Sequence, residues 1–203
     1  MFKQIILGTV AALAMASTVL AEATYTVGSV LPAELAVTDQ TGKTHTFGDF
    51  RGKNVVLEWT NYQCPFVRKF YDAGAMQAQQ AETTKAGHVW LSVISSAPGK
   101  QGHLEVKSAA AEVAKQGFKG TAVALDPAGT LGKAFGASTT PFMVVLDKEG
   151  KVTYTGAIDS IPSFNKDDIA GATNYVKAAL ADMGAGKAVA TAQTQSYGCS
   201  VKY

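Results

Sequence analysis

The stretch NVVLEWTNYQCPFVRKFY, residues 54–71, decides the fold. Its first part, residues 54–60, is a continuous β-prone run, which is typical of a strand buried at the centre of a sheet. Pro65 suits the first turn of a helix, so a helix is predicted to follow at once and to run toward Glu82, with Gly74 as a point where it can break. Cys64 therefore lies at the turn between a buried strand and a helix.

The rest of the chain repeats this alternation of strands and helices. Further strands are predicted at residues 88–95 and 122–125, and two hairpins pair residues 34–37 with 43–47 and residues 142–147 with 152–155. Helices are predicted over residues 105–116, 128–135 and 168–183. Parallel strands joined by helices, with an antiparallel pair finishing one edge, indicate a three-layer α/β fold.

The N-terminus is typical of a secretory signal peptide. One lysine precedes an apolar run over residues 5–20, and small residues suited to cleavage follow, so residues 1–23 are predicted to be removed. The alternative is a retained signal anchor, which is disfavoured because no basic flank follows the apolar run. We expect a periplasmic protein with one domain over residues 24–183 and an arm over residues 184–203.

The composition excludes several classes of function. The formal net charge is only +2, and the basic residues are scattered, so neither nucleic acid nor a membrane surface is an expected partner. The three histidines show no ligand spacing, and no metal site or other cofactor is predicted. The 47% of hydrophobic residues is enough for an ordinary core.

The two cysteines are the remaining candidates for chemistry. In an exported chain of this size, two cysteines suffice for one structural bridge or one redox pair. Free N–H groups and the positive end of a helix dipole favour the thiolate of Cys64. The alternative is that Cys64 is an inert buried side chain.

The order of several motifs resembles the thioredoxin superfamily. The motifs are Cys64-Pro65, Asp126-Pro127-Ala128-Gly129, Thr139-Thr140-Pro141 and the turn at residues 147–151. The chain is most similar to redoxins, the alkyl hydroperoxide reductase and thiol-specific antioxidant family. Within that family it resembles peroxiredoxin-like members ending in a tail such as Gly198-Cys199-Ser200-Val201-Lys202-Tyr203. The resemblance covers roughly residues 27–203 and implies a thioredoxin-like α/β/α sandwich with a mixed central sheet and an N-terminal hairpin.

The resemblance also implies roles for individual residues. Cys64 would be the attacking cysteine, and Pro141 a cis-proline that shapes the substrate groove together with Thr140. Glu58, six residues before Cys64, stands where thioredoxins keep a buried acid that accepts a proton. The alternative is that Glu58 faces solvent or pairs with a lysine.

The chain departs from both thioredoxins and peroxiredoxins. The sequence Cys64-Pro65-Phe66-Val67 lacks the nearby second cysteine of thioredoxins, so the partner thiol must come from elsewhere. Asn61 and Leu57 replace the Thr or Ser and the Pro that peroxiredoxins place before the attacking cysteine, and Pro141 stands near the position of their peroxide-binding arginine. Arg68 is a candidate substitute for substrate binding, although a solvent-facing helix arginine is equally expected.

The expected function is therefore an exported thiol oxidoreductase. Cys199 lies in an arm long enough to reach most of the domain and to form a disulfide with Cys64. In this interpretation Cys199 resolves the oxidised Cys64, and an external thiol reductant resets the pair. The substrate would be a thiol or disulfide protein partner or a hydroperoxide. The alternative is a non-enzymatic scaffold in which a Cys64–Cys199 disulfide merely pins the arm.

Overall fold

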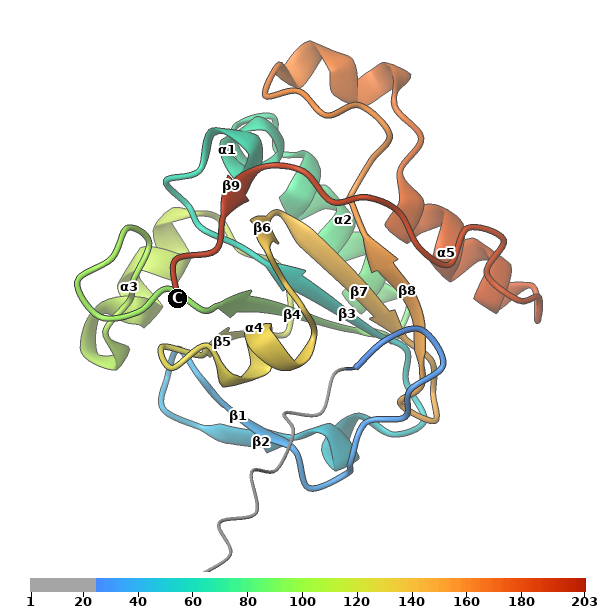
Figure 1. The fold of residues 1–203 in the computed structure, drawn as a ribbon, viewed down its shortest axis with the longest axis horizontal. Helices are drawn as coiled ribbons and strands as arrows, with labels where there is room; N and C mark the ends of the chain where they lie inside the picture. The colour runs from blue at the N-terminus through green and yellow to red at the C-terminus, as the bar shows by residue number, and fades with distance from the viewer. Residues whose placement is uncertain (1–24) are drawn as a thin grey trace, which may run out of the picture.

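A computed structural model describes residues 25–203, so the predicted signal peptide lies outside the described residues. Seven strands form a mixed sheet in the order β2-β1-β5-β4-β3-β7-β8 (Figure 1). Strand β3 pairs in parallel with β4, and β4 with β5, whereas the other pairings are antiparallel. The strands are β1 (Ala36–Asp39), β2 (Thr44–Thr46), β3 (Val55–Trp59), β4 (Val89–Ile94), β5 (Ala122–Leu125), β7 (Phe142–Leu146) and β8 (Val152–Gly156). The predicted α/β fold and both hairpins are confirmed.

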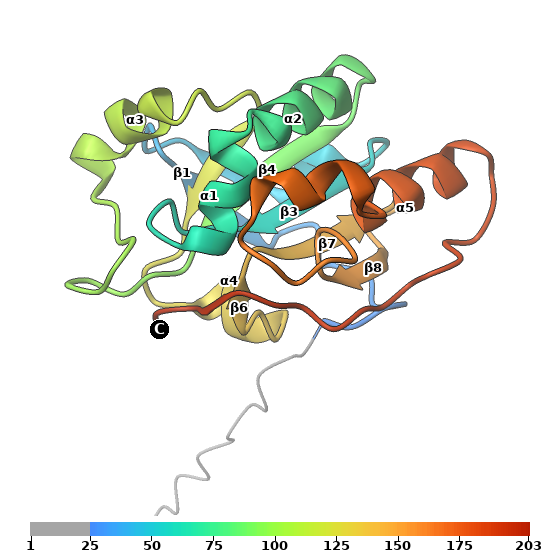
Figure 2. The ribbon, with the colours of Figure 1, turned by 90° about the horizontal axis from the view of Figure 1, so that it is seen from above.

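The helices cover both faces of the sheet (Figure 2). Helices α1, α2, α3 and α5 lie on one side of the sheet and the short α4 on the other. The α-helices are α1 (Pro65–Asp72), α2 (Ala75–Lys85), α3 (Val106–Lys115), α4 (Thr130–Ala134) and α5 (Tyr175–Gly184), and 3-10 turns occur at Phe47–Phe50 and Lys166–Gly171. Together with the sheet they make the expected three layers.

Strand β3 is the centre of the core. All five of its residues are buried, and alternate side chains serve the two faces. Val55, Leu57 and Trp59 pack with α4 residues in one apolar cluster, whereas Val56 packs with residues of α1 and α5 in the other. Because Glu58 alternates with Trp59, its side chain enters the layer beneath α1 and α2.

The break predicted at Gly74 is confirmed, whereas the start of the closing helix needed correction. The helix predicted from Pro65 toward Glu82 is divided into α1 and α2 at Gly74, whose positive φ of 70° ends the first segment. The closing helix predicted from residue 168 begins only at Tyr175. Its start is set by the Asn174 side chain, which accepts a hydrogen bond from the backbone N–H of Lys177 at 2.9 Å.

The arm was predicted to form no element, and this is wrong for its last residues. After α5 the chain returns past β8 and β7 and pairs two residues, β9 (Cys199–Ser200), antiparallel with β6 (Thr139–Thr140), as Figures 1 and 2 show. Further back, the backbone of Thr155 on β8 exchanges hydrogen bonds with Ala192 and Thr194. The arm is therefore docked along the domain.

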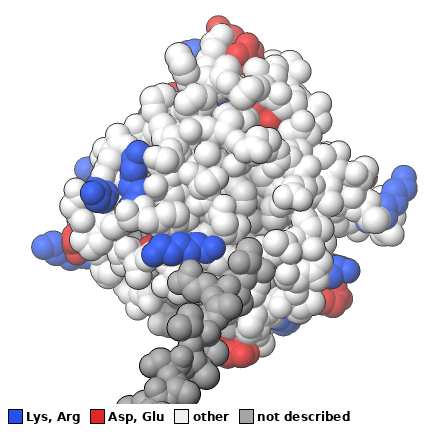
Figure 3. Space-filling model, viewed as in Figure 1, with Lys and Arg blue, Asp and Glu red and all other residues white. Residues whose placement is uncertain are grey.

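The surface agrees with the low net charge. On the face shown in Figure 3, basic and acidic side chains lie mainly toward the rim and do not gather into one patch. Within residues 25–203, no helix has the length and apolar character needed to cross a membrane.

Candidate active site

Cys64 lies where strand β3 leads into helix α1. It is the N-cap residue of α1, its side chain is buried, and Pro65 occupies the first helical position as predicted. The backbone N–H groups of Val67 and Arg68 bond the Cys64 carbonyl at 3.0 and 2.8 Å, which fixes the turn. The Cys64 thiol lies 3.2 Å from the carbonyl oxygen of Thr140 on β6.

Cys199 reaches Cys64 through the pairing of β9 with β6. Thr140 is the direct partner of Cys199 in this ladder, and the two sulfur atoms lie 2.6 Å apart without being bonded in this structure. The preceding residue, Gly198, has φ of +127°, and a Cβ there would collide with the Thr140 carbonyl. Only glycine lets the arm approach β6 this closely.

The two thiols differ in acidity. Burial raises the pKa of Cys64, but hydrogen bonds with Cys199, Thr140 and the backbone N–H of Val67 outweigh it, and the resulting pKa lies below the usual value. Burial and the neighbouring Cys64 raise the pKa of Cys199 to about 11. Of the two thiols, Cys64 is therefore the more acidic and the first to lose its proton.

The bond between Thr140 and Pro141 is a cis peptide, as the resemblance implied. Both residues are buried, and the Thr140 hydroxyl donates to the Cys199 carbonyl at 3.5 Å. In this structure the surface beside the cis-proline is covered by the arm. The role of this pair in shaping a substrate groove stays a prediction.

Glu58 is fully buried, which rules out the solvent-facing alternative. Its carboxylate is surrounded by neutral donors rather than by a lysine. Ser92 Oγ lies at 2.6 Å, Trp90 Nε1 at 2.9 Å, Tyr71 OH at 3.1 Å and Gln80 Nε2 at 3.2 Å. Burial raises the pKa of Glu58 more than these hydrogen bonds lower it. A carboxyl in this setting holds a proton more readily than one in water.

Arg68 and Asn61 make contacts that stabilise local structure. The Arg68 guanidinium donates to Gln116 Oε1 at 2.7 Å and pairs with Asp72 one turn further along α1. The Asn61 side chain accepts a hydrogen bond from the backbone N–H of Gln63 at 2.9 Å and so supports the turn before Cys64. Substrate binding by Arg68 stays a prediction without a supporting contact among the described residues.

Sequence reasoning missed a buried ion pair beside the cysteines. Lys69 of α1 and Asp159 are both buried, with Nζ and Oδ2 3.2 Å apart, and Tyr197 of the arm donates a hydrogen bond to the same carboxylate. The Tyr197 ring also packs edge-on against Phe66 at 5.9 Å. A lysine inside the apolar pattern of a helix is the only signal for this cluster, and it does not identify the partner.

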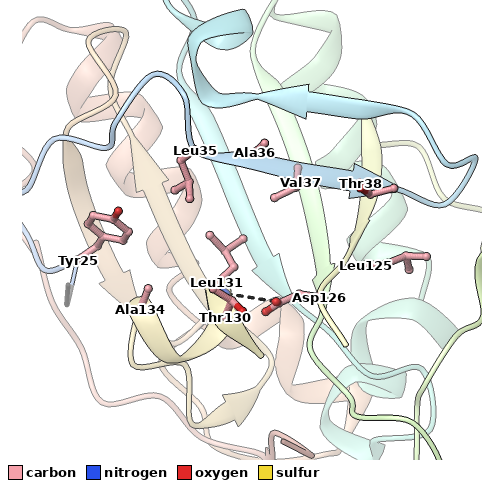
Figure 4. Close-up of a pocket in the computed structure, with 10 residues that line it drawn as sticks. All are labelled: Tyr25, Leu35, Ala36, Val37, Thr38, Leu125, Asp126, Thr130, Leu131 and Ala134. Atoms are coloured by element: carbon pink, nitrogen blue, oxygen red, sulfur yellow. Dashed lines mark hydrogen bonds between the residues drawn. The ribbon is translucent and has the colours of Figure 1, made fainter. Parts of the chain in front are cut away.

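A pocket of about 500 Å³ lies away from the cysteines, between β1 and α4 (Figure 4). Its walls are largely apolar, and its acidic residue is Asp126. That carboxylate is already used by the backbone N–H groups of Leu131 and Gly132 and by the Ser95 hydroxyl. Among the described residues, no group of three potential metal ligands is present.

Solved structures with a similar fold cover most of the chain. A hypothetical protein from Sinorhizobium meliloti 1021 has a TM-score of 0.70 at 22% identity, covering 89% of this chain and 94% of its own. An uncharacterized conserved protein from Geobacillus kaustophilus has a TM-score of 0.72 at 20% identity, covering 89% and 93%. A cysteine-to-serine mutant of PrxQ from Xylella fastidiosa has a TM-score of 0.51 at 15% identity, covering 66% and 86%. These similarities show the thioredoxin-like fold.

No curated protein matches the chain. The sequence does match the redoxin family over residues 26–173. Since that match spans well over half of the chain, this protein belongs to the redoxin family of thioredoxin-like redox proteins.

Proposed function

We propose that this protein is a thiol-disulfide oxidoreductase in which Cys64 attacks and Cys199 resolves. The observation that carries the proposal is the contact of the two sulfur atoms, 2.6 Å apart, with opposite shifts in pKa. A nucleophile with a lowered pKa beside a thiol with a raised pKa matches the order of the two roles.

The reaction has two exchange steps. The Cys64 thiolate attacks one sulfur of a substrate disulfide, the S–S bond breaks, and the leaving thiolate takes a proton from solvent. Cys199 then attacks Cys64 Sγ and gives up its proton, the mixed disulfide breaks, and the second substrate sulfur leaves and takes up that proton. A Cys64–Cys199 disulfide remains. An external thiol reductant returns both cysteines to the thiol form. The substrate disulfide thus gains two electrons that the reductant supplies.

The strand pairing that brings Cys199 to Cys64 favours disulfide exchange over peroxide reduction. It reaches Cys64 in an extended segment that pairs with Thr139 and Thr140, so this edge accepts a polypeptide carrying a thiol. The guanidinium of Arg68 is engaged by Gln116 and Asp72, and this leaves it a poor peroxide ligand. The test below therefore compares a hydroperoxide with a disulfide as the oxidant.

Two further roles belong to this proposal. Glu58, buried beneath α1, accepts the proton that the attacking Cys64 thiol gives up. Its burial and its raised pKa support this role. Residues 1–23 direct export to the periplasm, where the mature chain from residue 24 forms one redoxin domain with its arm. Export is supported by the signal-like sequence and is tested by the N-terminus of the protein recovered from the periplasm.

The test uses the mature protein in its reduced form, with thiol trapping and mass spectrometry. Glutathione disulfide should close the Cys64–Cys199 bond quickly, and hydrogen peroxide should do so slowly. Cys199→Ser should accumulate a mixed disulfide with glutathione, whereas Cys64→Ser should not.

Faster closure by peroxide would transfer the assignment to a peroxidase. A bond that opens only after unfolding would overturn the proposal in favour of a scaffold with a structural disulfide.

A further inference from the structure

Two tyrosines of the arm flank Cys199 in sequence, and each packs into a separate site on the domain. Tyr197 precedes Cys199 by two residues, and Tyr203 follows it by four. The contacts that hold these two tyrosines do not involve the sulfur of Cys64 or of Cys199. The arm is consequently held on both sides of Cys199 by interactions separate from its thiol.

Tyr197 is seated on the buried ion pair of α1. Its hydroxyl donates to Asp159, its ring lies 5.9 Å from Lys69 Nζ, and it packs edge-on against Phe66. Because Asp159 also pairs with Lys69, one carboxylate joins the arm to α1, the helix whose N-cap is Cys64.

Tyr203 is seated against α4 in a cradle made by two glycines. A Cβ on either Gly129 or Gly132 would collide with the Tyr203 side chain, so the absence of side chains there makes room for it. The Tyr203 hydroxyl donates to the Ala137 carbonyl at 2.6 Å, and Lys133 Nζ lies 5.6 Å from the ring. Helix α4, which precedes the cis-proline loop, thus provides a binding site for an aromatic side chain.

Between the two tyrosines, backbone hydrogen bonds align the arm. The N–H of Val201 donates to the Ser138 carbonyl at 3.0 Å, and the Lys202 carbonyl accepts from the N–H of Ala97 at 2.8 Å. Cys64 and Cys199 are unbonded in this structure, yet the arm is docked. The docked arm leaves the Cys64 side chain without solvent exposure.

We propose that Tyr197 and Tyr203 are positioning residues that dock the arm so that Cys199 lies over Cys64 before any bond forms. This inference rests on the proposed function and adds to it a control of access to Cys64. Each tyrosine raises the local concentration of the Cys199 thiol at Cys64. Each also keeps Cys64 closed to bulky thiols until the arm lifts, so a protein substrate must displace the arm to reach Cys64.

The population with a lifted arm can be measured where no disulfide can form. In the full chain with Cys199→Ser, a bulky maleimide should alkylate Cys64 only while the arm is lifted, so the rate follows the lifted fraction. Adding Tyr203→Ala should raise that rate about tenfold, and Tyr203→Phe, which keeps the ring, should raise it less. Gln195→Ala is the matched control, because this exposed arm residue bonds only its neighbour Ser196.

A second readout separates positioning from reactivity. Since Tyr203→Ala should change how often the arm lifts and not the Cys64 thiol itself, the rate should rise by the same factor across pH, without a shift of the titration midpoint. With Cys199 restored, Tyr197→Ala combined with Tyr203→Ala should lower the equilibrium constant for bond formation by glutathione disulfide at least about fivefold. In that reaction glutathione disulfide is reduced to two glutathione thiols as the protein thiols are oxidised.

The outcomes distinguish this inference from the proposed function. Equal alkylation rates with and without Tyr203, in proteins of equal circular dichroism, would overturn it, as would an equal increase in the Gln195→Ala control. A wild-type protein whose cysteines never bond, but whose alkylation responds to Tyr203, would overturn the proposed function and leave the docking intact.

Discussion

Replacing the buried carboxyl of Glu58 with an amide tests the electrostatics of the central sheet. Glu58→Gln keeps the size of the side chain and removes its charge. The amide oxygen can accept from Ser92, Trp90 and Gln80, which all bond the same carboxylate oxygen, while the NH₂ group faces the Tyr71 hydroxyl. We expect the variant to fold and, at pH 4, to differ from wild type by about 1 kcal/mol or less in unfolding free energy.

The difference should then change with pH in one direction. Burial raises the pKa of Glu58 above its usual 4.5, so the folded protein holds this proton more tightly than the unfolded chain does. The stabilisation is complete below the unfolded pKa and is lost as pH rises through the folded pKa. Between those two values, wild type should lose about 1.4 kcal/mol relative to Glu58→Gln for each pH unit. The glutamine variant should become the more stable protein toward neutral pH.

The assay is urea unfolding of both proteins from pH 4 to pH 8, followed by circular dichroism with the thiols kept reduced. Glu34→Gln at an exposed position gives the baseline for a change in net charge. A constant difference between wild type and Glu58→Gln would refute the raised pKa. A difference that grows in favour of wild type would show that the four hydrogen-bond donors outweigh burial.

Three further predictions concern the neighbourhood of the cysteines. Asp159→Ala leaves a buried lysine without its counter-charge and should lower the unfolding free energy by about 3–5 kcal/mol in urea; a loss below about 1 kcal/mol would contradict the buried pair. Gly198→Ala cannot approach β6 and should slow bond closure by glutathione disulfide about tenfold or more, whereas Gly184→Ala, whose added Cβ meets nothing within 4 Å, should not. In the reduced protein, thiolate absorbance should place the Cys64 midpoint below 9, and Cys199→Ala should move it upward because Cys199 is the main hydrogen-bond partner that lowers it; an unmoved midpoint would remove that cause.

Local patterns predicted the elements that local interactions determine. The run over residues 54–60 and Pro65 predicted a buried strand followed by a helix, because burial and the missing proline N–H act within a few residues. The late start of α5 was missed, since it depends on the Asn174 cap, which competes with several other polar residues nearby.

The orientation of Glu58 could not be decided from its strand. Alternating polarity normally separates a buried face from an exposed one, but all five residues of β3 are buried. The donors that surround the carboxylate come from β4, α1 and α2, which are distant in sequence. A buried carboxyl with four neutral partners is therefore a tertiary feature. The sequence indicated it only through the resemblance to thioredoxins, which keep an acid at this distance from the cysteine.

The sequence predicted Cys199 as the partner of Cys64, but it did not predict the path by which the arm brings the two together. The composition of the arm, richest in alanine and glycine, carries no period that predicts a strand. Its path is set by distant partners: β6, the Lys69–Asp159 pair and the glycine cradle of α4. Strand β6 is only two residues long, and β9 satisfies its exposed edge while placing Cys199 at Cys64. Because one pairing does both, lifting the arm uncovers the edge of β6 together with Cys64.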